Sequence, residues 1–284
     1  MSLRLAPVFV LGLCSVAAAA PDDDLSPSER FDKGIKTTGV FDVNDPVACS
    51  QAALKRIVGG GILPNDKVLG KNALGGEITA GGYAAQMRTI LQQAMDQLKA
   101  TGDTVVTEHH LCVGLGDFGD SGPNAVAVKV GYIFADPRLT DLINALPDRT
   151  MFSLDMFWVH ELSHHLQYWN GTPFEKDARD RRNELAADCA ASALVAARWT
   201  EAFALKSAAD GVVAAAVRVG DYDFEGKGHH GTPAERKAAA THGVQIVLDA
   251  RTAGTKLPTS KLLLDDCNAY IQKRDKATGP NWKD

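Results

Sequence analysis

The stretch "FWVHELSHHLQYW" (157–169) places three histidines and one glutamate within six consecutive positions. In an α-helix, positions i and i+4 lie on the same face, so His160 and His164 can direct their imidazoles to one point. His165 lies about 140° around the helix from His160, and we expect it to pack or to face solvent. The stretch therefore predicts a helix that supplies two ligands to one metal ion.

Glu161 directly follows the first of these histidines. It lies beside the ligand face, where a general base must be to reach a metal-bound water. Two histidines with an intervening glutamate in the order H-E-x-x-H are the pattern of zinc metalloproteases. The same pattern also occurs by chance on soluble helices, where both histidines would only decorate the surface.

The stretch "RRNELAADCAAS" (181–192) offers the third ligand that a catalytic zinc site usually requires. Glu184 begins an E-x-x-x-D pattern in an alanine-rich helical segment, and Asp188 falls one turn later on the same face. We expect Glu184 to complete the coordination. We expect Asp188 to accept a hydrogen bond from the outer N–H of a ligand histidine, which would fix its tautomer. Glycine and proline between the two helices predict the chain reversal that this needs.

The remaining elements follow from periodicity. Apolar residues at helical spacing predict helices over 83–100, 154–169, 178–199, 201–219, 233–250 and 259–273. The segments "TVVTEHHLCVGL" (104–115) and "NAVAVKVGYIFA" (124–135) are β-branched and partly alternating, which predicts extended structure. Thr232, Pro233 and Glu235 together predict a capping box at the start of one helix.

The first residues have the layout of a cleavable secretory signal. Arg4 is followed by an apolar run to Ala20 and then by small residues and acids. The run has about 16 residues, fewer than the roughly 20 needed to span a bilayer; an uncleaved membrane anchor is the alternative. We therefore assign residues 1–20 to a signal peptide and expect a secreted or periplasmic protein with no stable membrane insertion after cleavage.

The mature chain divides into three parts. Residues 21–80 are rich in Gly, Asp and Pro and predict an irregular N-terminal segment, with one helical candidate at "DPVACSQAALKRIV" (45–58). Residues 81–275 carry the predicted helices and strands and form one domain. Residues 276–284 are a C-terminal tail.

Cysteine content and charge limit the possible environments and partners. Export would leave an even number of cysteines, compatible with two disulfides in any of three pairings: Cys49, Cys112, Cys189 and Cys267. The formal net charge is −5 and no long basic run is present, which excludes nucleic acid and anionic membrane surfaces as expected partners. The sequence does not indicate an oligomeric state.

Three blocks, "HELSHHLQ", "ELAADCAAS" and "GHHGTPAERKAAATHG", with the weaker "VGYIFADPRLTDLI", resemble the bacterial neutral zinc metallopeptidases. These are exported or membrane-anchored proteins with a gluzincin-like site, and the blocks occur in the family's order between residues 82 and 245. The chain departs from the family at Ser163, where a glycine is usual, and in its cleavable N-terminus. The resemblance implies that the zinc ligands are His160, His164 and Glu184. It also implies that Glu161 is the catalytic acid/base and that His230 is an additional site residue.

The resemblance also implies a fold and a reaction. The expected fold is α+β, a mostly helical zincin-like metallopeptidase domain with a small β-sheet beside the active-site helix. Zinc would activate a water and polarise the scissile carbonyl, while Glu161 would take the proton and pass it to the leaving amine. The expected substrate is a peptide or protein. His230 or His229 is a candidate donor to the developing oxyanion, with Tyr168 more distant.

Several alternatives stay open at this point. The segment 124–134 would either pair with an extended peptide substrate or simply form part of a small sheet. The chain could be a non-catalytic zinc-binding protein of the cell envelope. It could also be a latent enzyme whose residues 21–80 cover the cleft until they are removed.

Overall fold

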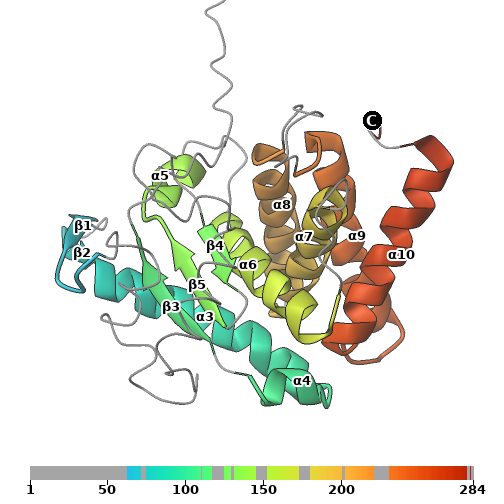
Figure 1. Cartoon of the computed structure of the whole chain (residues 1–284), viewed down its shortest axis with the longest axis horizontal. Helices are drawn as coiled ribbons and strands as arrows, with labels where there is room; N and C mark the ends of the chain where they lie inside the picture. Colours follow the sequence, from blue (N-terminus) through green and yellow to red (C-terminus); the bar gives the residue numbers. More distant parts are fainter. Residues whose placement is uncertain are drawn as a thin grey trace, which may run out of the picture.

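The computed structural model is an α+β protein, mostly helical with two small sheets (Figure 1). One helix, α6 (Ser153–Trp169), lies between a group of helices on one side and a three-stranded sheet on the other. The structure describes residues 63–71, 75–109, 111–116, 125–128, 131–144, 152–172, 180–199, 202–220, 230–279 and 282. The predicted signal peptide, the helical candidate at 45–58 and His229 lie outside these residues.

The helices on one side of α6 form what we call the helical half: α7 (Asp180–Ala197), α8 (Ala202–Arg218), α9 (Pro233–Thr252) and α10 (Ser260–Thr278). All were predicted, and their ends shift by a few residues. The largest shift is in α10, which continues to Thr278 and so includes part of the predicted C-terminal tail. It ends where Gly279 adopts a φ of 74°, a conformation that glycine adopts without steric cost. Trp282, beyond it, is buried.

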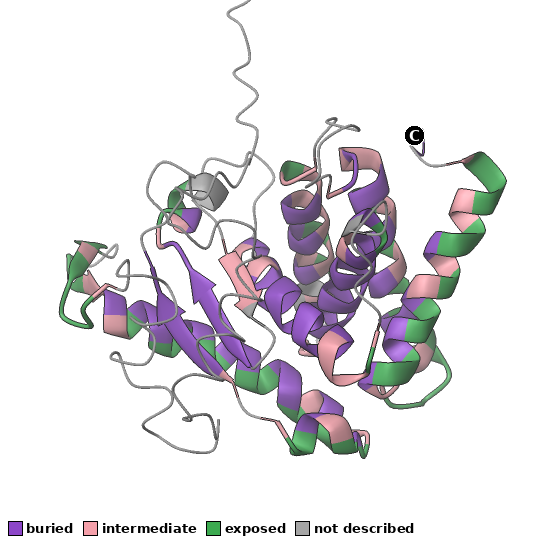
Figure 2. Cartoon of the chain, viewed as in Figure 1, coloured by how far each residue is buried: buried purple, intermediate pink, exposed green. Residues whose placement is uncertain are grey.

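The opposite side of α6, which we call the sheet half, contains α3 (Ala80–Ala100) and a sheet of order β3-β5-β4. In this sheet, β3 (Cys112–Leu115) runs parallel to the central strand β5 (Tyr132–Ala135), and β4 (Ala125–Val128) runs antiparallel to it. Every residue of β3 and β5 is buried (Figure 2). The extended segment expected over 124–135 is therefore two paired strands. A short helix, α5 (Leu139–Asn144), follows β5.

One expectation about extended structure was wrong, and the irregular structure expected over 21–80 is interrupted in its described part. Thr104–Thr107, expected to be extended, forms the helical turn α4, because the Asp103 side chain accepts from Val106 N and caps it; this local capping outweighs the β-propensity of the turn. The segment expected to be irregular up to residue 80 contains the antiparallel strands β1 (Val68–Lys71) and β2 (Glu77–Thr79).

The predicted capping box of α9 is confirmed. The Thr232 hydroxyl accepts from Glu235 N at 3.3 Å, and the Glu235 carboxylate accepts from Thr232 N at 2.8 Å, with Pro233 in the first turn. These reciprocal bonds satisfy two of the N–H groups that a helix start leaves without partners. The other oxygen of the Glu235 carboxylate accepts from Arg181 Nε of α7 at 3.1 Å, which attaches the start of α9 to that helix.

The helices α7 and α9 pack with their backbones in close approach. A Cβ atom built on Gly243 of α9 would lie 2.0 Å from the carbonyl oxygen of Cys189 on α7, so only glycine fits there. The same Cβ would also lie 3.1 Å from the backbone nitrogen of Ala193, a small and fully buried residue of α7. This packing brings side chains of α9 within reach of the polar face of α7.

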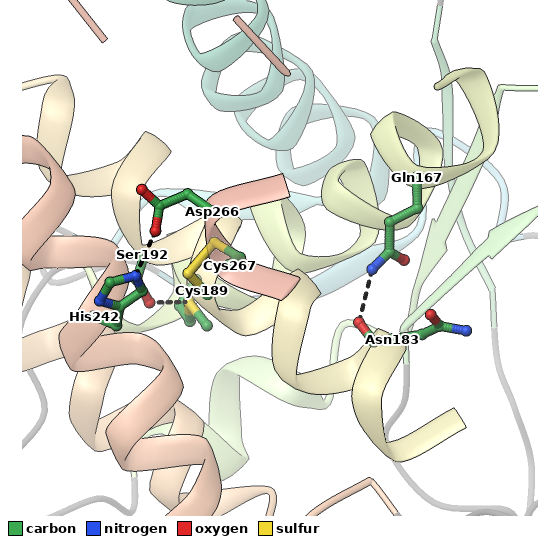
Figure 3. Close-up of a disulfide and its surroundings, with 8 residues drawn as sticks. Gln167, Asn183, Cys189, Ser192, His242, Asp266 and Cys267 are labelled. Carbon is green, nitrogen blue, oxygen red and sulfur yellow. Dashed lines mark hydrogen bonds and ion pairs between the residues drawn. A yellow bond between two sulfur atoms is a disulfide. The ribbon is translucent and has the colours of Figure 1, made fainter. Parts of the chain in front are cut away.

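One disulfide joins α7 to α10. Cys189 and Cys267 are bonded at 2.03 Å (Figure 3), which selects one of the pairings that the sequence left open. Cys112 is also disulfide-bonded; Cys49 lies outside the described residues. No helix among the described residues has the length and apolar character needed to cross a membrane.

Candidate metal centre

Three side chains from α6 and α7 converge on one point. His160 Nε2 lies 3.1 Å from His164 Nε2 and 3.0 Å from Glu184 Oε2, and His164 Nε2 lies 3.3 Å from Glu184 Oε1. Tetrahedral zinc with ligand bonds of about 2.0–2.1 Å holds its donor atoms about 3.3 Å apart. The spacing of His160, His164 and Glu184 therefore fits a metal ion.

The first ligand histidine is held from behind by a buried ion pair. His160 Nδ1 lies 2.9 Å from Asp188 Oδ1, and Arg236 of α9 donates to both oxygens of that carboxylate at 2.7 Å. Asp188 is fully buried and Arg236 is 4% exposed. A carboxylate only accepts hydrogen bonds, so Nδ1 carries a proton, and once the imidazole gives up its other proton to bind a metal, the Nε2 lone pair faces the other ligands.

Arg236 was not identified from the sequence. A buried carboxylate requires a counter-charge, but the chain has 30 lysines and arginines and no spacing rule selects this one. Its place depends on the close contact between α7 and α9. Gln167, whose Oε1 lies 2.9 Å from His164 Nδ1, was also not identified from the sequence, although it lies three residues after His164 on α6.

Glu161 lies beside the ligand group and faces the sheet half. It is 8% exposed, and its carboxylate accepts a hydrogen bond from the backbone N–H of Ala127 in β4. Burial raises the pKa of Glu161; His160, His164 and the Ala127 N–H oppose this shift only in part. A carboxyl with a raised pKa is suited to exchange protons near neutral pH.

The charges of the site suit a dication. Glu161 and Asp188 are buried and Glu184 is half-buried, and Arg236 contributes one positive charge beside them. With the three carboxyl groups ionised and the histidines neutral, two negative charges are in excess. Burial lowers the pKa of His160, but its contacts with Asp188 and Glu184 outweigh burial and raise the pKa to about 10. The pKa of Glu184 lies well below its ordinary value, because the histidines outweigh the effect of burial. In metal-free protein, protons thus supply the positive charge that a metal ion would bring.

The other histidines considered from the sequence take different positions. His165 is fully buried, with Nε2 3.0 Å from the carbonyl oxygen of Tyr132 in β5, and its ring stacks on Trp169; of the two expectations, it packs. His230 is partly buried in the loop before α9 and is not a member of the ligand group. The Tyr168 ring packs edge-on to His165. The roles predicted for His230 and Tyr168 stay predictions.

Comparisons of the chain with protein-family models, with curated proteins and with solved structures gave no match.

Proposed function

We propose that the protein is a zinc-dependent metallopeptidase with a zincin-like catalytic domain. The observation that carries this proposal is the joint placement of His160, His164 and Glu184 as a ligand group with Glu161 buried beside it. Imidazole and carboxylate donors suit zinc. The charge excess of the site also favours a divalent cation.

The residues divide the chemistry between them. Zinc held by the three ligands supplies Lewis acidity and a water of lowered pKa. Glu161 accepts a proton from the attacking water and returns it to the leaving amine. The Ala127 N–H orients the Glu161 carboxylate, and Asp188 keeps the imidazole of His160 in the required tautomer. His230 is the proposed donor to the oxyanion.

The substrate that we propose is an extended peptide or protein segment. Among the described strands, β4 is paired only with β5, and the backbone N–H of its Ala127 reaches the general base. A peptide main chain paired along the other edge of β4 would place its carbonyl beside Glu161. The Cys189–Cys267 disulfide supports a location in an oxidising compartment, and we propose that the protein is secreted or periplasmic.

Cleavage of a diverse peptide library, followed by mass spectrometry, tests this function. The zinc-loaded protein is compared with Glu161→Gln and with Glu77→Gln, a control at an exposed residue of β2. We expect Glu161→Gln to reduce turnover by about 10²–10⁴-fold, because general acid–base catalysis contributes that much. Zinc content should be equal in all three proteins.

Three other results of the peptide-library experiment would contradict or change the proposal. Undiminished cleavage by Glu161→Gln would show that this residue is not the base. Zinc binding without cleavage by any of the proteins would favour the non-catalytic zinc-binding protein. Cleavage that appears only after removal of residues 21–62 would identify a latent enzyme.

A further inference from the structure

Gln167 connects the second ligand histidine to the helix that carries the third ligand. It lies on α6, three residues after His164, and its side chain is fully buried. Its Oε1 lies 2.9 Å from His164 Nδ1, and its Nε2 donates to the backbone carbonyl of Asn183 at 2.8 Å (Figure 3). Asn183 directly precedes Glu184 on α7.

The orientation of the Gln167 amide follows from these contacts. A backbone carbonyl can only accept, so the NH₂ group of Gln167 must face Asn183. Its oxygen then faces His164, so Nδ1 of that histidine must carry the proton. In the neutral, metal-binding form of His164 the lone pair is then on Nε2, which points to His160 and Glu184.

We infer that Gln167 is a positioning residue for the metal centre, acting on two ligands at once. It fixes the tautomer of His164, and it holds the α7 backbone next to Glu184 at a set distance from α6. His160 is supported differently, by the charged pair of Asp188 and Arg236. The amide of Gln167 has no charge to lose, so its support does not depend on protonation. This inference rests on the proposed zinc site but not on peptidase activity.

Zinc affinity, measured by competition with a chromophoric chelator, tests the inference in the full chain. Gln167→Met preserves volume but removes both hydrogen bonds, and we expect it to weaken zinc binding about 10–100-fold, as loss of such outer contacts does. Gln245→Met, at an exposed glutamine of α9 that bonds only along its own helix, should leave zinc affinity within about twofold of the unmodified protein.

A second variant separates the two contacts. Gln167→Glu keeps an acceptor for His164 but loses the donor to Asn183. We expect it to bind zinc at least about tenfold more tightly than Gln167→Met, while its melting temperature falls. In zinc-loaded protein, the Nδ1–H proton of His164 should exchange with solvent faster in Gln167→Met than in Gln167→Glu, as followed by NMR. A purely structural role would not separate the two variants in this way.

Equal zinc affinities for Gln167→Met, Gln167→Glu and the Gln245→Met control would overturn the inference while leaving the zinc site intact. Failure of the unmodified protein to bind zinc would instead remove the proposed site, and the inference with it. If Gln167→Met does not fold, Gln167→Glu still decides, because a melting temperature equal to that of the unmodified protein would reject the contact with Asn183. If both Gln167 variants keep the His164 proton exchange rate and the melting temperature of the unmodified protein, neither hydrogen bond of Gln167 supports the site.

Discussion

The two halves of the molecule shift the pKa values of two histidines on one helix in opposite directions. His160 faces the carboxylates Asp188 and Glu184 of the helical half, which raise its pKa to about 10 against the effect of burial. His165, five residues later, faces the sheet half. Burial lowers its pKa to about 4, and the carbonyl of Tyr132 opposes this only in part. The residue type and the helix are the same, so the neighbouring elements determine the charge.

This difference divides the work at the site between the two halves. The helical half supplies negative charge and the third ligand, which favour a cation. Among the described residues, the sheet half offers backbone groups: the carbonyl of Tyr132 to His165 and the N–H of Ala127 to Glu161. Changes in the helical half should therefore act first on metal binding and on the free energy of unfolding. Changes near β4 should act first on turnover.

The largest effect on stability is expected from removing the charge that balances Asp188. Arg236→Met removes both guanidinium hydrogen bonds from the fully buried Asp188, leaves His160 as its partner, and should lower the free energy of unfolding by about 3–5 kcal/mol. Urea unfolding of the metal-free protein measures this loss. The control is Arg182→Met, since Arg182 is 46% exposed in its ion pair with Asp275 and should lose less than about 1 kcal/mol. Similar losses for both variants would show that the pair at Asp188 is no more important than a surface contact.

The next largest effect is the loss of folding stability at acidic pH that we expect from His165. His165 Nε2–H donates to Tyr132 O, and Nδ1 has no hydrogen-bond partner among the described residues. The folded pKa of about 4 lies below the ordinary 6.5, so the unfolded chain takes up this proton first. Stability should then fall as the pH drops from about 6.5 to about 4, by about 3 kcal/mol. Unfolding in urea at pH 7 and pH 4.5, with a chelator present, measures the loss.

The variant that tests this assignment is His165→Gln, whose amide nitrogen replaces Nε2 and can still donate to the Tyr132 carbonyl, but which cannot titrate. Its loss of stability between pH 7 and pH 4.5 should be smaller than that of the unmodified protein by most of this amount. If both proteins lose stability equally, the acid sensitivity comes from other groups, and the contrast with His160 does not extend to stability.

The smallest effect compares the packing of the two halves. Gly243→Ala in α9 would drive a Cβ into the Cys189 carbonyl, and overpacking of this kind costs about 1–3 kcal/mol, although alanine itself favours a helix. Gly82→Ala in α3 is the matched control, because its new Cβ would meet only the Thr79 hydroxyl at 3.3 Å. Calorimetric melting should show a lower Tm for the first variant only. A lower Tm for both would mean that the halves are packed alike at these positions.

The sequence was informative where function depends on spacing within one helix. Positions i and i+4 brought His160 and His164 together, and the same rule placed Glu184 and Asp188 on one face of α7. It was not informative where two elements must meet. Arg236 and the Ala127 N–H reach the site only through the packing of α9 on α7 and of β4 on α6, which no local pattern encodes. At Thr104 a local pattern was present but was overruled. The β-propensity of residues 104–107 predicted extended structure, whereas the capping side chain of Asp103 stabilises a helical turn.

The disulfide between α7 and α10 has a further consequence for a protein that is proposed to cut peptide bonds. Cys189 and Cys267 are 78 residues apart, so the chain between them, with α8 and α9, forms a closed covalent ring. A single break anywhere in that ring opens it without releasing a fragment. A nicked molecule therefore keeps Arg236 attached to the helix that it supports and can retain its shape. Under reducing electrophoresis such molecules would separate into two pieces, whereas without reductant they would run as one.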